Sequence, residues 1–233
     1  MKRKFNICTL LAGAASLLAS CSAGYNITGT SIQSVYDGDM VMLRPMSVDD
    51  EKAIDSCKIL HGKFTMTGPV DSVMCVRMFI GNMGDNIPVI LEQGDIHVSS
   101  TSTGMKVEGT PLNDKFYAFM TQRDSLQYLI NELPRQESKM ILDGVPEDEI
   151  MSLLGEKLGS LGSQVDKLET DFVTDNYDNV LGITYFLVLC ESAYQQYGFP
   201  TTTPQIDDIY GRAPESFRNH KLVMEYMDRC NGK

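Results

Sequence analysis

The hydrophobic pattern of this chain changes its period at Thr110, and this change constrains the fold more than any other feature. Residues 25–109 form short segments rich in Val, Ile, Met and Thr, separated by turn dipeptides such as Asp37-Gly38 and Thr103-Gly104. Frequent turns between short alternating segments favour an antiparallel β-sandwich or barrel. After Pro111 the apolar residues recur at helical spacing. The sequence therefore predicts an α+β chain, with an antiparallel β domain at 25–109 and a helical extension at 110–233 packed on or beside it.

The best-specified turn of the β half is His61-Gly62, because glycine can supply the positive φ that a two-residue hairpin turn requires. We expect the flanking strands to pair Leu60 with Lys63, Ile59 with Phe64 and Cys57 with Met66. This register directs one set of side chains inward, namely Cys57, Ile59, Phe64 and Met66.

In the next strand, alternation directs Cys75 and Arg77 outward and the intervening apolar residues inward. The chain has 14 methionines, and six of them fall in expected strands, where we interpret them mainly as core filling: Met40, Met42, Met46, Met66, Met74 and Met78.

Five helical segments are expected in the second half. Thr110 can cap a helix that begins at Pro111 and ends before Pro134. A second helix begins at Pro146, where Glu147-Asp148-Glu149 face the positive end of the helix dipole. A buried helix at about 178–197 and a short one from Pro204 to Tyr210 follow, and Pro214 opens a last helix that ends near Arg229.

The second of these helices carries one apolar stripe, made of Ile150, Leu154, Leu158, Leu161, Val165, Leu168 and Phe172. Gly155, Gly159 and Gly162 lie beside this stripe. Glycine weakens a helix, so these three residues suggest close approach by a neighbouring element.

The first 20 residues have the three parts of a secretory signal: basic Lys2, Arg3 and Lys4, an apolar stretch at 7–18, and small residues before a cysteine. Leu18-Ala19-Ser20-Cys21 resembles the bacterial lipobox, in which the cysteine receives a diacylglycerol and, after cleavage, an amide-linked acyl chain. We expect residues 1–20 to be a signal peptide, Cys21 to be lipidated, and residues 21–24 to form the lipidated N-terminus and a short linker.

The net charge of −11, from 31 acidic and 20 basic residues, argues against nucleic acid as a partner. It also leaves the acyl chains, rather than basic residues, to hold the protein on a lipid membrane, and several chains suffice for stable attachment. We expect a lipid-anchored protein of the bacterial cell envelope, at the periplasmic face of the outer membrane.

Several short segments together resemble a known family: Ile27-Thr28-Gly29, Val41-Met42-Leu43, Asp55-Ser56, Gly62-Lys63-Phe64 with Gly68, Leu91-Glu92-Gln93-Gly94, Gly109-Thr110-Pro111-Leu112-Asn113 and Asn176-Tyr177-Asp178-Asn179-Val180-Leu181-Gly182. They are similar to a lipoprotein domain of unknown function, over residues 25 to about 229. In that family the domain usually precedes a thioredoxin-like domain of the alkyl hydroperoxide reductase and thiol-specific antioxidant type.

This chain departs from the family pattern in one respect. It has no Trp and no Cys-x-x-Cys motif, which the thioredoxin-like domain would carry. The resemblance therefore implies the N-terminal domain standing alone, with no catalytic residue to transfer and no cofactor. It also implies, as a partner, another envelope protein such as a thioredoxin-like lipoprotein.

Four cysteines remain for the mature body beyond Cys21: Cys57, Cys75, Cys190 and Cys230. Four cysteines allow three pairings. Since Cys57 and Cys75 are expected on opposite faces, only Cys190 with Cys230 is a reasonable pair, and free packed thiols are the favoured interpretation. The outward Cys75 is the candidate reactive thiol.

Neither a metal site nor an active site is indicated elsewhere. His61, His97 and His220 lack ligand neighbours at zinc spacing, and His97 is expected on the outward side of its strand. The acidic runs Asp49-Asp50-Glu51 and Glu147-Asp148-Glu149 fit a loop and a first helical turn better than a divalent cation site.

These features favour a non-catalytic envelope lipoprotein, a binding or partner module without enzyme activity. The alternative is a thiol-redox accessory or enzyme acting through a single reactive cysteine. A surface adhesin or glycan-binding protein is a third hypothesis, weakened by the absence of Trp.

Overall fold

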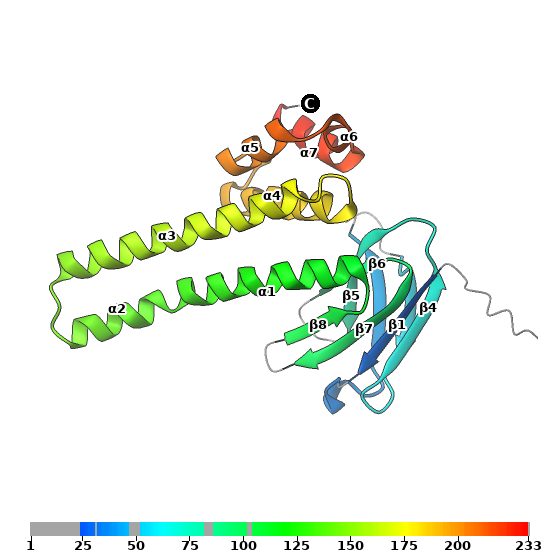
Figure 1. Cartoon of the computed structure of the whole chain (residues 1–233). Coiled ribbons are helices and arrows are strands. Elements are labelled where there is room, and N and C mark those ends of the chain that lie inside the picture. Colours follow the sequence, from blue (N-terminus) through cyan, green and yellow to red (C-terminus); the bar gives the residue numbers. More distant parts are fainter. Residues whose placement is uncertain (1–23, 31, 47–51, 82–85, 102–103, 233) are drawn as a thin grey trace, which may run out of the picture.

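The computed structural model describes residues 24–30, 32–46, 52–81, 86–101 and 104–232. The fold is α+β, as predicted, with two four-stranded sheets followed by a helical half (Figure 1). The expected signal peptide, Cys21 and the acidic run at 49–51 lie outside the described residues, and of the expected linker only Gly24 lies inside them.

The two sheets pack face to face as a β-sandwich. One sheet has the strand order β4-β1-β7-β8, and it contains β1 (Gly24–Thr30), β4 (Phe64–Pro69), β7 (Gly94–Thr101) and β8 (Gly104–Glu108). The other has the order β3-β2-β5-β6, and it contains β2 (Met40–Pro45), β3 (Asp55–Lys58), β5 (Met74–Ile80) and β6 (Ile87–Leu91). Alternate side chains of both sheets fill one apolar core, which includes Ile27, Leu43, Val76, Val89 and Val98.

The expected turn at His61-Gly62 is present, but the hairpin extends no further than its first pair. Both residues have positive φ, 53° and 69°, and their amides donate to the carboxylate of Asp37. Leu60 pairs with Lys63 as predicted. The predicted pairing of Ile59 with Phe64 and of Cys57 with Met66 is wrong, since β3 pairs with β2 while β4 pairs with β1 in the opposite sheet.

This turn therefore forms a corner between the two sheets, a place where sandwiches often transfer the chain. The residues predicted to point inward do so, although β3 and β4 belong to different sheets. Ile59, Phe64 and Met66 are buried, and Cys57 packs against the same core while partly exposed.

One strand pair departs from the antiparallel expectation, because β1 and β7 are parallel, with Ile27 opposite Ile96. No short turn joins these two strands, and most of the sandwich lies between them in the sequence, so no hairpin constrains their direction. The remaining neighbouring strands are antiparallel.

Only two of the six strand methionines, Met66 and Met78, belong to the sandwich core. Met66 and Met78 are buried and Met42 is partly exposed, whereas Met40, Met46 and Met74 are exposed at or just beyond strand ends. Met40, Met42 and Met46 alternate with the core residues Val41 and Leu43, so they have the parity of the outward side of β2. Met74 has the inward parity of Val76 and Met78, but it is the first residue of β5.

The helical half contains α1 (Pro111–Asn131), α2 (Leu133–Leu142), α3 (Glu147–Thr174), α4 (Val180–Tyr197), α5 (Pro204–Arg212), α6 (Glu215–Arg218) and α7 (Lys221–Cys230), and a short 3-10 helix, η1 (Ser34–Tyr36), lies in the β half. The first helix ends before Pro134 as predicted, but a second helix, α2, begins at once. Pro134 lies in the first turn of α2, where its missing N–H is not needed.

The single last helix predicted from Pro214 is two helices, with an extended His220 between them. Phe217 and Val223 are six residues apart, and residues at this spacing do not share a helix face. The break between α6 and α7 allows both side chains to enter the core of the helical half.

The start of α1 is capped differently from the prediction. The side chain of Thr110 makes no capping bond to the helix backbone. Instead Glu92 Oε1 accepts from the amides of Leu112 at 2.8 Å and Asn113 at 3.1 Å. The buried Asn113 side chain in turn bonds both the N–H and the C=O of Ile90 in β6. These bonds attach the first turn of α1 to the sandwich.

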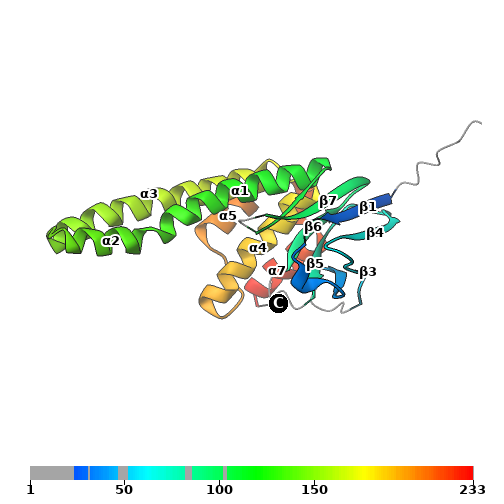
Figure 2. The same cartoon turned by 90° about the horizontal axis from the view of Figure 1, so that it is seen from below.

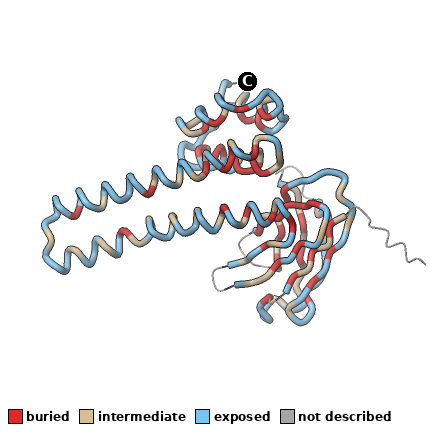
Figure 3. The backbone as a smooth tube through the Cα atoms, in the orientation of Figure 1, coloured by how far each residue is buried: buried red, intermediate tan, exposed pale blue. Residues whose placement is uncertain are grey.

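A second core holds the helical half together and meets the sandwich through its outer face. It surrounds α4, whose buried residues include Leu181, Phe186 and Cys190, and it also contains Cys75 of β5 and Ile90 of β6. Figure 3 shows buried segments concentrated in the sandwich and in α4. The two halves thus have separate cores in contact across the sheet β3-β2-β5-β6.

Helices α1 and α2 run out from the sandwich and α3 runs back beside them, forming a long antiparallel arm (Figures 1 and 2). With 28 residues, α3 is about 42 Å long at the usual rise per residue. Most of its outer half is exposed (Figure 3). None of the helices in the described ranges is long and apolar enough to cross a membrane.

The glycines of α3 do not mark a close contact. A Cβ added at Gly155, Gly159 or Gly162 would find no atom within 4 Å outside its own helical turn. The predicted packing role of these residues is wrong. The real close approach is at Gly182 in α4, where a Cβ would overlap the backbone carbonyl of Asn176.

Candidate functional site

The candidate thiol Cys75 lies on the predicted face of β5 but is not accessible. It points away from the sandwich core, and the helical half covers that face, leaving Cys75 only 7% exposed. Burial raises the pKa of its thiol to about 12, despite opposing contributions from a hydrogen bond with Thr184 and from the charge of Arg77. A reactive cysteine needs an exposed group with a lowered pKa. Cys75 therefore does not fit the role of a reactive thiol.

The three other cysteines in the described part of the chain, Cys57, Cys190 and Cys230, are also free thiols. Burial raises the pKa of Cys57, Cys190 and Cys230. Cys190 and Cys230 lie near each other, since the charge of a Cys230 thiolate further raises the pKa of Cys190. The pair considered for a disulfide is therefore close in space, but it is unbonded.

The histidines lie apart from one another. His61 is in the corner turn, and His220 precedes α7. His97 is on the outward side of β7, as predicted, with Nδ1 2.8 Å from the hydroxyl of Thr28. Within the described ranges, no group of three or more His, Cys, Asp or Glu residues is arranged to hold a metal ion.

A buried polar cluster between α1, α3 and α4 was not predicted from the sequence. Glu169, only 5% exposed, accepts from Arg123 Nε and from the hydroxyl of Tyr185, each at 2.7 Å. Burial and the Glu169 charge raise the pKa of Tyr185 well above its usual value. Gln205 of α5 also lies within hydrogen-bond distance of Glu169. A pocket of about 220 Å³ opens beside this cluster.

The polar atoms of this cluster are satisfied by one another. A paired buried charge is retained when its partners and hydrogen bonds are in place. Its geometry ties four helices together at the root of the arm, so we assign it a structural role. Its sequence signal was one acidic residue, Glu169, beside the apolar stripe of α3.

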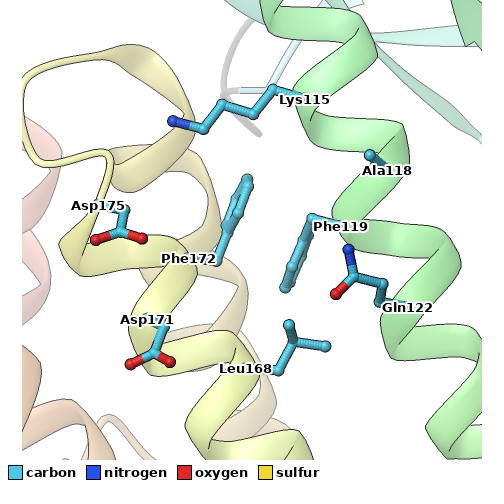
Figure 4. A pocket seen from close by; sticks show the side chains of 8 residues that line it. All are labelled: Lys115, Ala118, Phe119, Gln122, Leu168, Asp171, Phe172 and Asp175. Atoms are coloured by element: carbon cyan, nitrogen blue, oxygen red, sulfur yellow. The ribbon is translucent and has the colours of Figure 1, made fainter.

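A second hollow of about 270 Å³ lies between α1 and α3 (Figure 4). Its floor is the pair Phe119 and Phe172, stacked with ring centroids 3.8 Å apart. In Figure 4 Lys115 extends from α1 towards α3. Asp171 of α3 and Asp175, the residue after the end of α3, lie at the rim. Asp171 already pairs with Lys167 at 2.5 Å. The hollow is thus an open groove above the aromatic core, with a mixed-charge rim.

The most distinctive exposed surface is the outer half of the arm, which presents large apolar side chains to solvent. We call this surface the arm tip; it consists of Tyr128, Leu129, Ile141, Leu142, Met151, Leu153 and Leu158. Leu142 is 86% exposed, Met151 69% and Ile141 60%. Single exposed apolar residues are common; here seven large ones lie on one projecting arm.

The apolar pattern of the sequence predicted the arm tip only in part. Leu158 belongs to the predicted apolar stripe of α3, yet it is 50% exposed, whereas Ile150 and Leu161 of the same stripe are buried. The acidic residues Asp143, Glu147, Asp148 and Glu149 are exposed at the end of the arm. The last three lie in the first turn of α3, as predicted.

Comparison with known proteins identifies the β half. Residues 25–116 match a protein family described as a domain of unknown function, DUF4369. The match covers the sandwich and the first turns of α1, so the chain carries a DUF4369 domain whose last residues begin the arm. No curated protein and no solved structure matches the chain.

Proposed function

We propose that this protein is a lipid-anchored, non-catalytic binding module of the bacterial cell envelope, which docks a partner protein through the arm tip. The observation that carries this proposal is the number of large apolar side chains exposed on a helical arm that projects from the body. An apolar helical surface of this kind is suited to a hydrophobic groove on another protein.

The position of the expected anchor supports this arrangement. Cys21 precedes the start of β1 by three residues. The start of β1 lies at the end of the molecule opposite to the far end of the arm, where α2 meets α3 (Figures 1 and 2). A chain held at Cys21 on the periplasmic face of the outer membrane would direct its arm away from the lipid.

The charge of the arm tip indicates the kind of partner. Between Met140 and Met151 the chain has four acidic residues and no basic one. Opposite charges around an apolar contact select partners and speed their association. We therefore propose a protein partner with an apolar groove and a basic rim, rather than a second acidic copy of this chain. A thioredoxin-like lipoprotein of the envelope, as the family resemblance implies, is the first candidate.

Site-specific crosslinking tests the docking surface. A photo-crosslinking residue is placed at Leu142 and, as a matched control, at Lys58, an exposed position on the sandwich. We expect irradiation of intact cells to give one discrete adduct with a different polypeptide from position 142 and none from position 58. An adduct with twice the mass of this chain, or equal labelling from both positions, would contradict the proposal.

A charge-reversal variant separates specific docking from general stickiness. Replacing Asp148→Lys and Glu149→Lys keeps the apolar residues but inverts the local charge. The adduct from position 142 should then weaken strongly, with the circular dichroism spectrum unchanged. If the adduct forms in undiminished yield, the partner does not recognise the acidic charge, and the proposal of a basic rim is wrong.

The anchor is tested independently. Cys21→Ala should abolish incorporation of radiolabelled fatty acid and release the protein from the membrane fraction. If this variant still incorporates label and sediments with membranes, the lipoprotein assignment is wrong, whatever the crosslinking result.

A further inference from the structure

Two arginines lie directly opposite each other on the outer face of the sandwich. Arg44 of β2 and Arg77 of β5 are register partners in an antiparallel pair. Their neighbours Leu43, Val76 and Met78 point into the sandwich core. Successive residues of a strand alternate between faces, so both arginines project from the opposite side, where each remains partly exposed.

The ring of Phe79 holds both guanidinium groups in one place. The guanidinium carbon of Arg44 lies 5.3 Å from the ring centroid, and that of Arg77 lies 5.9 Å from it. Both distances are within the range of a cation–π interaction. This shared contact directs two positive charges to the same small area of the sheet.

This arrangement is unfavourable for the chain by itself. Like charges directly opposite each other destabilise a pair of strands. Among the described residues, neither Arg44 nor Arg77 forms an ion pair, although Arg123, Arg135 and Arg212 each have a carboxylate partner. Since the chain has 31 acidic residues, the pairing of two arginines with no acid beside them in the described part of the chain is unexpected.

The Nε atoms of the two arginines add a second energetic penalty. Both Nε atoms are buried and have no hydrogen-bond partner in the described structure. The Nη2 atom of Arg44 has only the sulfur of Met42 at 3.9 Å, a weak acceptor. A buried donor without an acceptor is rare in native proteins and calls for a specific explanation.

We propose that Arg44 and Arg77 form a binding site for a phosphomonoester group. Such a group carries nearly two negative charges at neutral pH and three acceptor oxygens. It can neutralise both arginines at once, and each guanidinium can offer it the N–H donors of its two Nη atoms, since the Nε atoms are buried. A single carboxylate would leave one of the two charges uncompensated. The phosphomonoester is carried by a soluble metabolite or by a lipid headgroup, and the experiment distinguishes the two.

The arginine side chains themselves provide the measurement. The full-length protein is prepared in neutral detergent micelles with ¹⁵N-labelled arginine, and the Nε–Hε signals of Arg44 and Arg77 are assigned from Arg44→Lys and Arg77→Lys. Glycerol 3-phosphate is added to one sample, and a short-chain phosphatidic acid is incorporated into the micelles of another. Sodium chloride at equal ionic strength is the control, and the exposed Arg135, paired with Glu132, is the internal reference.

We expect the two signals to shift together and to saturate with a single Kd in the millimolar range or below, while Arg135 does not follow. Each Lys variant keeps the charge but lacks the planar fork, and should weaken binding about tenfold or more. Saturation with glycerol 3-phosphate identifies a soluble phosphomonoester, and saturation with phosphatidic acid alone identifies a lipid headgroup.

Absence of a saturable shift with both probes would overturn the proposal. Equal shifts with chloride, or unchanged affinity in both Lys variants, would overturn it as well. The titration of the unmodified protein is decisive by itself. A Lys variant that is destabilised therefore does not affect this outcome. The result is also independent of docking at the arm tip, which lies on other elements.

Discussion

The three glycines of α3 provide a sharp test of the arm, because sequence and structure lead to opposite expectations. If Gly155, Gly159 and Gly162 were packing positions, alanine would clash and destabilise the protein. In the structure an added Cβ at each position meets nothing within 4 Å. Each glycine then costs only helix propensity, roughly 1 kcal/mol relative to alanine.

The combined change Gly155→Ala, Gly159→Ala and Gly162→Ala should therefore stabilise α3 by roughly 2–3 kcal/mol. If the chain unfolds as one unit, about 1 kcal/mol corresponds to about 2–4 °C for a protein of this size. The expected rise in Tm is then roughly 4–12 °C. If the arm unfolds locally, the same free energy should appear as slower hydrogen exchange of α3 amides.

Gly182→Ala is the matched control in the other direction. Its Cβ would lie 2.7 Å from the carbonyl carbon of Asn176 and closer still to the oxygen, and backbone cannot move as a flexible side chain can. The expected destabilisation is about 1–3 kcal/mol. Circular dichroism melting and hydrogen exchange measure both variants. A lower Tm for the triple variant, without protection of α3, would refute the open arm, and a neutral Gly182→Ala would refute the contact between α4 and Asn176.

Two further predictions concern the corner turn and the thiols. Gly62→Val places a β-branched residue at φ 69°, with its Cβ 2.9 Å from the carbonyl oxygen of Ile32, so Tm should fall as expected for a loss of about 1–3 kcal/mol of stability. The control Thr65→Val, at an exposed position, should change Tm little. Equal Tm values for both variants would mean that the turn is misassigned. In the body comprising residues 22–233, an aromatic disulfide reagent should react quickly with the partly exposed Cys57 and Cys230, and with the buried Cys75 and Cys190 only after unfolding. Burial raises the pKa of Cys75 from 9.0 to about 12, so the stability conferred by its neutral form is complete below pH 9.0 and is lost as pH rises towards 12. Urea unfolding at pH 8 and pH 10 should show a smaller alkaline loss in Cys75→Ala than in the unmodified body, and identical losses would contradict the burial of this thiol.

Features that depend on neighbouring residues in the chain could be predicted from the sequence. The turn at His61-Gly62 requires only positive φ, and the start of α3 requires only Pro146 and the acidic residues after it. Alternation alone placed Ile59 and Phe64 inward and His97 outward. Such features are decided within a few residues by backbone geometry and by the period of the apolar side chains.

The candidate site could be predicted only in part. The apolar stripe of α3 was visible, but exposure of Leu158, Leu142 and Met151 depends on how far the arm extends beyond the body that could cover it. The pairing of Arg44 with Arg77 is equally invisible in the sequence, because the two residues are 33 positions apart and meet only through strand register. The proposed lipid anchor is a different case, since the pattern that predicts it lies wholly in residues 1–21.

What the sequence by itself determined is therefore the inward and outward alternation within each strand, the starts of the long helices, and the change from β to α structure at Thr110. Only the tertiary structure decided that β3 and β4 belong to opposite sheets, that β1 lies parallel to β7, and that an outward Cys75 is buried. The physical reason is that alternation defines two faces of a strand but does not say what covers each face. That choice depends on the packing of the whole chain, in which the helical half covers the outer face at Cys75 and leaves Arg44 and Arg77 partly exposed.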